Sequence, residues 1–179
     1  MPNNFLVTGQ PRSGKTTVVQ KVVRDLRTEG VTVGGVFCPE IRVRDERVGF
    51  EIEDAMNGDT RVLAHVNRDW GPSVGKYRVA VQDVDELCEQ AFERALTRTD
   101  AIVVDEIAPM EVHSDAFVRG VERALDDEKP LVAAIHERST SGFIGEVKRR
   151  DDVEVFTVSG QTREALPGRI VALVLECLE

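Results

Sequence analysis

The segment from Gly9 to Thr16 constrains this chain more than any other, because it combines glycines, a lysine and a hydroxyl at a fixed spacing. It reads Gly-Gln-Pro-Arg-Ser-Gly-Lys-Thr, which fits the pattern G-x-x-x-x-G-K-[ST]. The apolar run Phe5-Leu6-Val7 precedes it, and apolar residues at helical spacing follow it from Gly14 to Arg27. We therefore predict a strand, a glycine loop and a helix in immediate succession.

A loop of this kind is a phosphate-binding loop, or P-loop. Its glycines let the backbone wrap a phosphate with the N–H groups pointing inward, and the helix N-terminus adds positive potential. We expect Lys15 to reach the β- and γ-phosphates of a nucleoside triphosphate, and Thr16 to offer its hydroxyl to Mg²⁺. The nucleotide-binding residues predicted here are Gly9, Gln10, Pro11, Arg12, Ser13, Gly14, Lys15, Thr16 and Thr17.

A second motif stands in the middle of the chain, where four apolar residues precede two acidic ones. This is the form of a Walker B strand, in which a carboxylate at the end of a buried strand completes the magnesium shell. Asp105 is predicted to bind the metal together with Thr16, and Glu106 to orient or deprotonate the attacking water. The residues predicted to line the nucleotide site here are Ile102, Val103, Val104, Asp105, Glu106, Ile107, Ala108 and Pro109.

Phosphoryl transfer also develops negative charge that a further cation would stabilise. Arg12, Arg149, Arg150 and Arg163 are the candidates, and the sequence does not choose among them. The run Lys148-Arg149-Arg150 precedes Asp151-Asp152, a pattern more typical of a solvated, self-compensating charge cluster than of an arginine finger.

The rest of the chain alternates apolar runs of strand length with helical patterns, which predicts a mostly parallel sheet with helices on both faces. We expect one α/β P-loop NTPase domain of three layers over residues 1–179. Residues 39–81 instead show short alternating runs between turns, and predict a small antiparallel β insertion. Further predicted elements are a second strand at 31–37, helices at 83–96, 115–125 and after Pro167, and strands at 101–104, 131–135 and 153–158.

Composition excludes several classes of protein and partner. The formal net charge of −9 over 179 residues disfavours a nucleic-acid or anionic lipid partner, because both need a positive face. Its three cysteines are odd in number and lack metal-ligand spacing, so a reducing, cytoplasmic location is expected. No apolar run is long enough to span a bilayer. The sequence leaves any protein partner unknown.

The run Asp105-Glu106-Ile107-Ala108-Pro109-Met110-Glu111 resembles the THEP-type nucleoside triphosphatases, in which a D-E-I-G-x-M-E-like run follows the Walker B strand. The resemblance extends nearly end to end. It implies a RecA-like core, Glu106 as the hydrolytic carboxylate, and hydrolysis of several nucleoside triphosphates to diphosphates with little base selection. The chain departs from the family at Ala108, where glycine is usual, and at Pro109, where some members carry a lysine. If that lysine stabilises charge in those members, this protein either manages without it or uses an arginine.

Two other functions remain open. A nucleotide or small-molecule kinase uses the same phosphate cradle, and the insertion could form its acceptor pocket. The acidic pair favours water as the acceptor, since Glu106 directly follows the predicted metal ligand. A nucleotide-gated switch or accessory protein would use hydrolysis only to change a partner interface.

Overall fold

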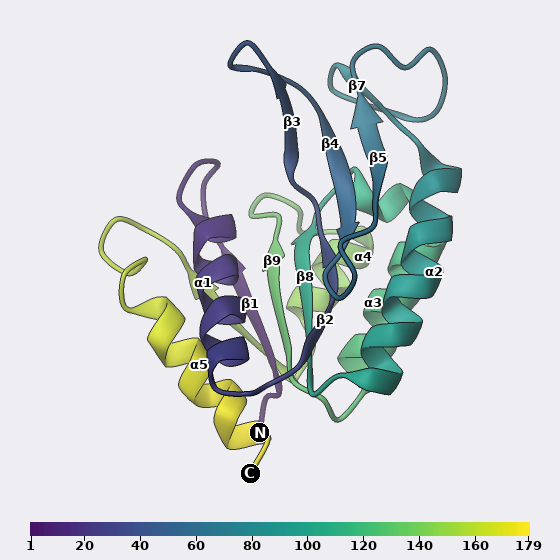
Figure 1. Ribbon diagram of the computed structural model, residues 1–179. Coiled ribbons are helices and arrows are strands. Elements are labelled where there is room, and N and C mark those ends of the chain that lie inside the picture. Colours follow the sequence, from purple (N-terminus) through teal and green to yellow (C-terminus); the bar gives the residue numbers. More distant parts are fainter.

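The buried apolar runs form the parallel half of a ten-stranded sheet in the computed structural model, which describes residues 1–179 (Figure 1). These strands lie in the order β10-β1-β9-β8-β2, and each neighbouring pair is parallel. Their bounds are β1 (Asn4–Thr8), β2 (Val33–Phe37), β8 (Ala101–Ile107), β9 (Leu131–Ile135) and β10 (Val153–Thr157).

The insertion continues the same sheet on the far side of β2. Its strands pair antiparallel, and Val36 of β2 lies opposite Asp54 of β4. The expected antiparallel β insertion is therefore confirmed. The bounds are β3 (Glu40–Val43), β4 (Glu46–Asp54), β5 (Thr60–His65), β6 (Ser73–Val74) and β7 (Tyr77–Val79). Figure 1 shows the β3–β4 hairpin standing well beyond the ends of β8 and β9.

Helices cover both faces of the sheet, which confirms the predicted three layers. One face carries α1 and α5, and the other carries α2 and α3, with α4 beside them (Figure 1). The bounds are α1 (Lys15–Thr28), α2 (Val81–Arg98), α3 (Asp115–Asp126), α4 (Gly142–Lys148) and α5 (Leu166–Cys177), with a 3₁₀ turn at Glu111–His113.

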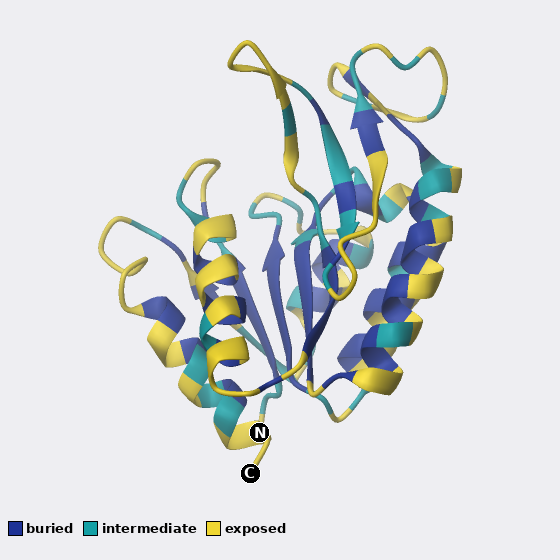
Figure 2. Ribbon diagram, viewed as in Figure 1, coloured by how far each residue is buried: buried dark blue, intermediate teal, exposed yellow.

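Each central strand buries side chains on both faces, as Figure 2 shows for the middle of the sheet. In β1, Leu6 packs into the cluster under α2 and α3, while Phe5 and Val7 pack into the cluster under α1 and α5. In β8, Val104 packs into the cluster under α2 and α3, and Val103 into the cluster under α1 and α5. Two-sided burial explains why these strands are continuous apolar runs without polar alternation.

Local sequence signals mark several of the helix ends. The Ser114 hydroxyl accepts the Phe117 N–H at 3.1 Å and caps α3, as expected. Gly30 follows α1 with a φ of 83°, a left-handed conformation that favours glycine at a helix end. α5 begins at Leu166, so Pro167 lies in its first turn and does not precede the helix.

Two further features differ from the sequence predictions. β8 does not end on the acidic pair but runs through it to Ile107, because pairing with β9 resumes there: Ile107 lies opposite Ile135. The short helix α4 was not predicted, since its seven residues include two glycines and span too few turns to show an apolar period.

The strand order decides what lies near the glycine loop. β9 lies between β1 and β8, so β2 does not pair with β1 although α1 connects them. Since parallel strands end at one edge, the segments after β1, β9, β8 and β10 gather there. None of the helices combines the length and apolarity needed to cross a bilayer.

A substitution at Gly35 would test how closely β2 packs against β8. Its φ is 127°, and a Cβ there would lie 1.9 Å from the carbonyl oxygen of Val103. We expect Gly35→Ala to lower the free energy of unfolding by about 3 kcal/mol in urea denaturation. Gly168→Ala, inside α5 with open space around it, is the control and should be neutral or slightly stabilising. Equal stability of the two variants would contradict this account.

Candidate nucleotide and magnesium site

The predicted glycine loop lies at the carboxyl edge of the sheet, between β1 and α1. Gly9 and Gly14 have φ values of 153° and 103°, and a Cβ on Gly9 would lie 2.7 Å from both Ser13 Oγ and the Val158 carbonyl oxygen. Gly14 directly precedes α1, so the free N–H groups of the first helical turn face the loop. The backbone therefore has the tight path that a phosphate cradle requires.

Successive residues of α1 contact successive carboxylates of β8. The ammonium of Lys15 lies 3.2 Å from Glu106 Oε2, and the hydroxyl of Thr16 donates to Asp105 Oδ1 at 3.4 Å. In a regular strand, neighbouring side chains point to opposite faces. Here the β8–β9 register shifts between Val104 and Ile107, and both carboxylates reach the start of α1. The peptide bond between them is cis.

The acidic pair is not electrically equivalent. Asp105 is 6% exposed, and burial, followed by the nearby charge of Glu106, raises its pKa to about 7 although the Thr16 hydroxyl and Lys15 act in the opposite direction. Glu106 is more open, with 31% of its side chain exposed. Asp105 thus gains most from a bound cation, while Glu106 can reach water.

Further acidic groups lie behind this pair. Glu111 is buried, and desolvation together with the charge of Glu106 raises its pKa well above the ordinary range. The pKa of the half-buried Cys38 thiol is raised by desolvation and by the charges of Glu111 and Asp105. This part of the site holds more acidic groups than cations, which favours binding of a metal ion or another positive group.

The donor set fits magnesium bound through phosphate. There is no cluster of three or more His, Cys, Asp or Glu side chains able to hold a metal by itself. Mg²⁺ needs only one or two protein oxygens beside phosphate oxygens and water, and the Thr16 hydroxyl and Asp105 carboxylate supply a pair. The buried Ser13 Oγ has no hydrogen-bond partner, so the loop also has an unused hydroxyl.

Comparisons with known proteins agree with this geometry. The family model described as NTPase matches residues 4–171. Nucleoside-triphosphatase THEP1 of Methanopyrus kandleri is 46% identical over 180 residues, covering 100% of this chain and 99% of that protein. The THEP1 of Thermofilum pendens is 43% identical and covers 93% of this chain and 92% of its own. The chain belongs to this NTPase family.

Solved structures extend the similarity to the fold of the NTPase. The crystal structure of THEP1 from the hyperthermophile Aquifex aeolicus has a TM-score of 0.84 at 28% identity and covers 96% of this chain and 98% of that one. The solution structure of a human cancer-related nucleoside triphosphatase has a TM-score of 0.80 at 29% identity, with 98% of both chains covered. The α/β P-loop architecture is therefore shared from end to end.

The four arginines considered from sequence lie in different surroundings. Arg12 is exposed within the glycine loop, and the Cδ atom of Arg163 lies 3.9 Å from where a Gly14 Cβ would be. Both are at the phosphate edge. Arg150 precedes β10 at the opposite edge, where ion pairs engage its guanidinium and raise its pKa. Arg149 donates to the Thr140 carbonyl.

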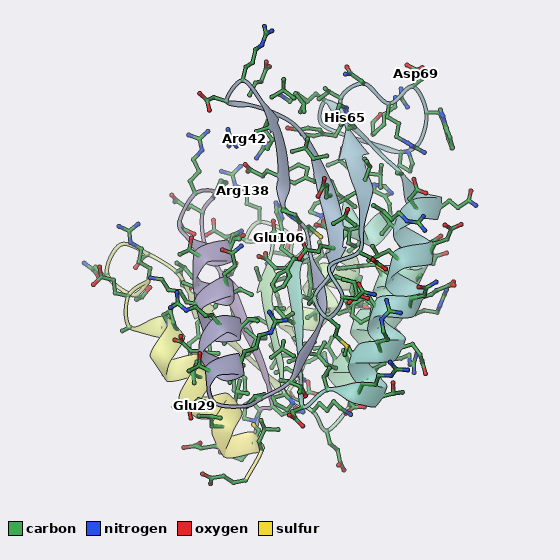
Figure 3. The ribbon with its side chains drawn as sticks, in the orientation of Figure 1. Glu29, Arg42, His65, Asp69, Glu106 and Arg138 are labelled. Carbon is green, nitrogen blue, oxygen red and sulfur yellow. The ribbon has the colours of Figure 1, made fainter.

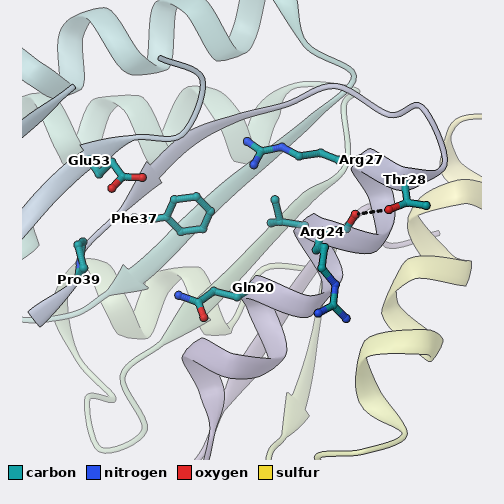
Figure 4. A pocket seen from close by; sticks show the side chains of 8 residues that line it. Gln20, Arg24, Arg27, Thr28, Phe37, Pro39 and Glu53 are labelled. Carbon is teal, nitrogen blue, oxygen red and sulfur yellow. Dashed lines mark hydrogen bonds between the residues drawn. The ribbon is translucent and has the colours of Figure 1, made fainter. Parts of the chain in front are cut away.

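A cavity of about 590 Å³ in this NTPase lies between the middle and end of α1 and the ends of β2 and β4 (Figure 4). Its lining residues are Gln20, Val23, Arg24, Arg27, Thr28, Phe37, Pro39 and Glu53. Phe37, one of the lining residues, lies opposite Asp105 in the β2–β8 ladder, but neither residue of the acidic pair lines the cavity. It includes no residue of the glycine loop.

Sequence reasoning gave no role to residues 136–140, which follow β9 between the glycine loop and the acidic pair. The buried run Leu131–Ile135 was the available signal, since a parallel strand beside β1 and β8 must end at their edge. Glu111 was noted only as part of a family motif, and a buried carboxyl has no separate signature in a single sequence.

Asp105→Asn tests the electrostatics of the NTPase without its metal. Because the folded-state pKa is raised above the unfolded value, Asp105 costs no stability below about pH 4 and an increasing amount as the pH rises through about 7. In EDTA, the variant should be more stable than the unsubstituted protein at pH 8 by about 2 kcal/mol, or roughly 4–8 °C in Tm. The difference should disappear toward pH 4.

Thermal denaturation between pH 4 and pH 8 gives the measurement, with Asp69→Asn as the control. Asp69 is exposed, so its substitution should leave the pH dependence unchanged. A Tm for Asp105→Asn below that of the unsubstituted protein at pH 8 would contradict this account. It would show that neighbouring groups stabilise the ionised carboxylate even without a bound cation.

Proposed function

We propose that this protein hydrolyses nucleoside triphosphates to nucleoside diphosphates and phosphate, in a magnesium-dependent reaction that accepts ATP, GTP, CTP and UTP or TTP. Nucleoside-triphosphatase activity itself follows from membership of the family. The observation that carries the detailed proposal is the pairing of Lys15 with Glu106 and of Thr16 with Asp105. This pairing supports a site in which a phosphate ligand, two magnesium ligands and a water-accessible carboxylate would lie together.

Residues 9–17 bind the triphosphate in this proposal. The loop amides and the N-terminus of α1 contact the phosphate oxygens, and Lys15 binds the β- and γ-phosphates. Thr16 and Asp105 would hold Mg²⁺, which, when bound, neutralises charge on the β- and γ-phosphate oxygens. A bound cation also offsets the charge that makes an ionised Asp105 unfavourable when buried.

Lys15 has to exchange partners for turnover to begin. In the structure its ammonium is paired with Glu106 at 3.2 Å. A γ-phosphate carries more negative charge than one carboxylate, so Lys15 is expected to turn to the phosphate. Glu106 is then released to accept a hydrogen bond from water.

The freed Glu106 acts as the general base. It takes a proton from the water whose oxygen bonds to the γ-phosphorus, while the bond from that phosphorus to the β–γ bridging oxygen breaks. The products are inorganic phosphate and the nucleoside diphosphate. Exposure of about a third of the Glu106 side chain leaves room for this water.

In this proposal the loop after β10 borders the base, because β10 is parallel to β1 and its loop leaves the sheet at the same edge as the glycine loop. The Thr162 hydroxyl donates to the Thr157 carbonyl at 2.8 Å and accepts the Ser159 N–H at 2.9 Å. These side-chain groups are therefore satisfied within the loop. Groups already paired in this way do not favour one base edge over another, because strong discrimination needs polar partners that the wrong ligand leaves unpaired.

A kinase is the second candidate, and the cavity between α1 and β2 favours it. Phe37 of its lining lies opposite Asp105, so an acceptor held there would be near the acidic pair. The lining includes no group hydrogen-bonded to Lys15 or Thr16. Water therefore remains the proposed acceptor.

The proposal includes a cytoplasmic location and no nucleic-acid partner. Cys38, Cys88 and Cys177 are all free thiols, as is usual for proteins of a reducing compartment. The formal net charge of −9 opposes binding to a phosphate backbone.

Glu106→Gln is expected to bind nucleotide and magnesium at least as tightly as the unsubstituted protein, because Lys15 loses its competing partner. Its phosphate-release rate should fall by about two or more orders of magnitude, since the amide cannot take a proton. Titration with a fluorescent nucleotide and single-turnover phosphate release measure the two effects. Turnover within about twofold of normal would remove Glu106 from the mechanism.

Lys15→Ala and Thr16→Ala should instead weaken binding of nucleotide with magnesium, because they remove phosphate and metal ligands. The four nucleotides are compared with and without Mg²⁺ and with EDTA. Comparable, magnesium-dependent release from all four supports the proposal. Tight binding without release by the unsubstituted protein would favour a kinase or a switch.

A further inference from the structure

The segment His136–Thr140, here called the β9 loop, is fixed at the phosphate edge of the sheet. The His136 N–H donates to the Ile107 carbonyl at 3.0 Å, which ties the loop to the strand of the acidic pair. On the other side, the Thr8 hydroxyl donates to the Ile135 carbonyl at 3.1 Å, just before the glycine loop begins. The β9 loop thus bridges the two halves of the site.

Lys148 holds this loop from within. Its ammonium donates to the carbonyls of Glu137 and Ser139, at 2.9 and 2.7 Å. The Ser139 hydroxyl is itself hydrogen-bonded to His136 Nδ1 at 2.8 Å. The two carbonyls bound by Lys148 flank Arg138, so the backbone of Arg138 is held on both sides.

Lys148 interacts electrostatically with Lys15, the phosphate-binding lysine. Burial lowers the pKa of Lys148, Glu137 opposes this shift, and the charge of Lys15 adds to it. The β9 loop is therefore within electrostatic range of Lys15, as expected for a segment between β1 and β8.

Arg138 lies in the loop that Lys148 holds, and its own side chain has no partner. Its side chain is exposed and has neither an ion pair nor a hydrogen bond. Arg149, by contrast, donates to the Thr140 carbonyl, and Arg150 is bound by acidic side chains at the opposite edge. Figure 3 shows Arg138 and Glu106 at the same edge of the molecule, on the side of the β3–β4 hairpin.

The site has a need for such a group. Lys15 is the one cation hydrogen-bonded to the acidic pair, although three carboxyl groups, of Asp105, Glu106 and Glu111, interact there. Charge that builds up on the γ-phosphoryl oxygens during transfer is stabilised by a further cation. Pro109, directly after the acidic run, contributes none.

We infer that Arg138 contacts the transferred γ-phosphoryl group and stabilises its charge in the transition state, and that Lys148 is the positioning residue that holds the β9 loop for this contact. The inference rests on the proposed hydrolysis and adds no bond-making step to it. The guanidinium donates hydrogen bonds to phosphoryl oxygens while the water attacks. Planar, permanently charged and weakly hydrated, it suits this task better than an ammonium.

Arg138→Ala tests the catalytic part of the inference. We expect kcat for ATP to fall by about 10²–10³-fold, with the nucleotide Kd within about threefold, because the contact forms mainly in the transition state. Added guanidinium ion should restore part of the lost rate in Arg138→Ala but none in Glu106→Gln. Arg119→Ala, which removes an exposed arginine of α3, is the control and should keep normal kcat.

Normal kcat in Arg138→Ala, or a loss confined to Kd, would overturn the assignment of Arg138. So would equal effects of guanidinium on Arg138→Ala and Glu106→Gln. If the unsubstituted protein released no phosphate at all, the proposed hydrolysis would fall, and this inference with it. Normal turnover with an unaffected Arg138→Ala variant would overturn the inference alone.

Lys148→Met tests the positioning role, and a double variant separates it from a general effect on folding. Lys148→Met should lower kcat by about tenfold or more while leaving Kd nearly unchanged. In the Arg138→Ala background the same substitution should add less than about twofold, because its effect passes through Arg138. If the fold-loss of kcat in the double variant equalled the product of the losses in the two single variants, the positioning role would be overturned. Normal kcat in Lys148→Met would also overturn it.

Discussion

The contact between the first turn of α1 and the acidic pair of β8 is the constraint on which the rest of the structure depends. Lys15 and Thr16 are neighbours in the chain, and so are Glu106 and Asp105, yet each residue finds a partner across the site. That match requires a helix beginning at Lys15, a strand with shifted register, and a fixed separation between the two. β9 provides the separation, because it lies between β1 and β8 and pairs with both.

The site is kept ready for ligands at some cost in stability. Asp105 and Glu111 are buried carboxyl groups whose pKa values are raised mainly by desolvation, so their ionised forms are disfavoured in the folded state. An apolar residue at either position would avoid this cost. The fold tolerates it because the sheet buries apolar side chains on both faces, in clusters of 27 and 18 residues. Active sites commonly combine such strain with a well-packed support.

Much of this arrangement could be predicted from the sequence, for identifiable reasons. Gly9–Thr16 and the acidic pair have local signatures, because phosphate binding needs particular residue types at particular spacings. The buried strands show as apolar runs and the insertion as alternating ones. Each of these signals lies within a few neighbouring residues.

What could not be predicted depends on pairing between distant segments. The order of the strands, the register shift at Asp105–Glu106 and the contacts of Lys148 with carbonyls about ten residues earlier leave no local pattern. The run Lys148-Arg149-Arg150 illustrates the difficulty, since it reads as one charge cluster. In the fold, Lys148 donates to two carbonyls of the β9 loop, Arg149 donates to the Thr140 carbonyl, and Arg150 lies at the opposite edge. Three adjacent cations thus have three separate environments.

The two halves of the sheet divide stability from access to the site. In the parallel half, helices cover both faces of β1, β9 and β8, and these strands are almost entirely buried. The insertion is less well covered: Val43, Met56, Val62 and Trp70, four of the large hydrophobic residues exposed on the surface, all lie within it. The insertion joins the parallel half at β2, which pairs with β8. Phe37 of β2 lies opposite Asp105 and also lines the cavity next to α1. Changes in the insertion can therefore alter which molecules approach the acidic pair without disturbing the packing that positions it.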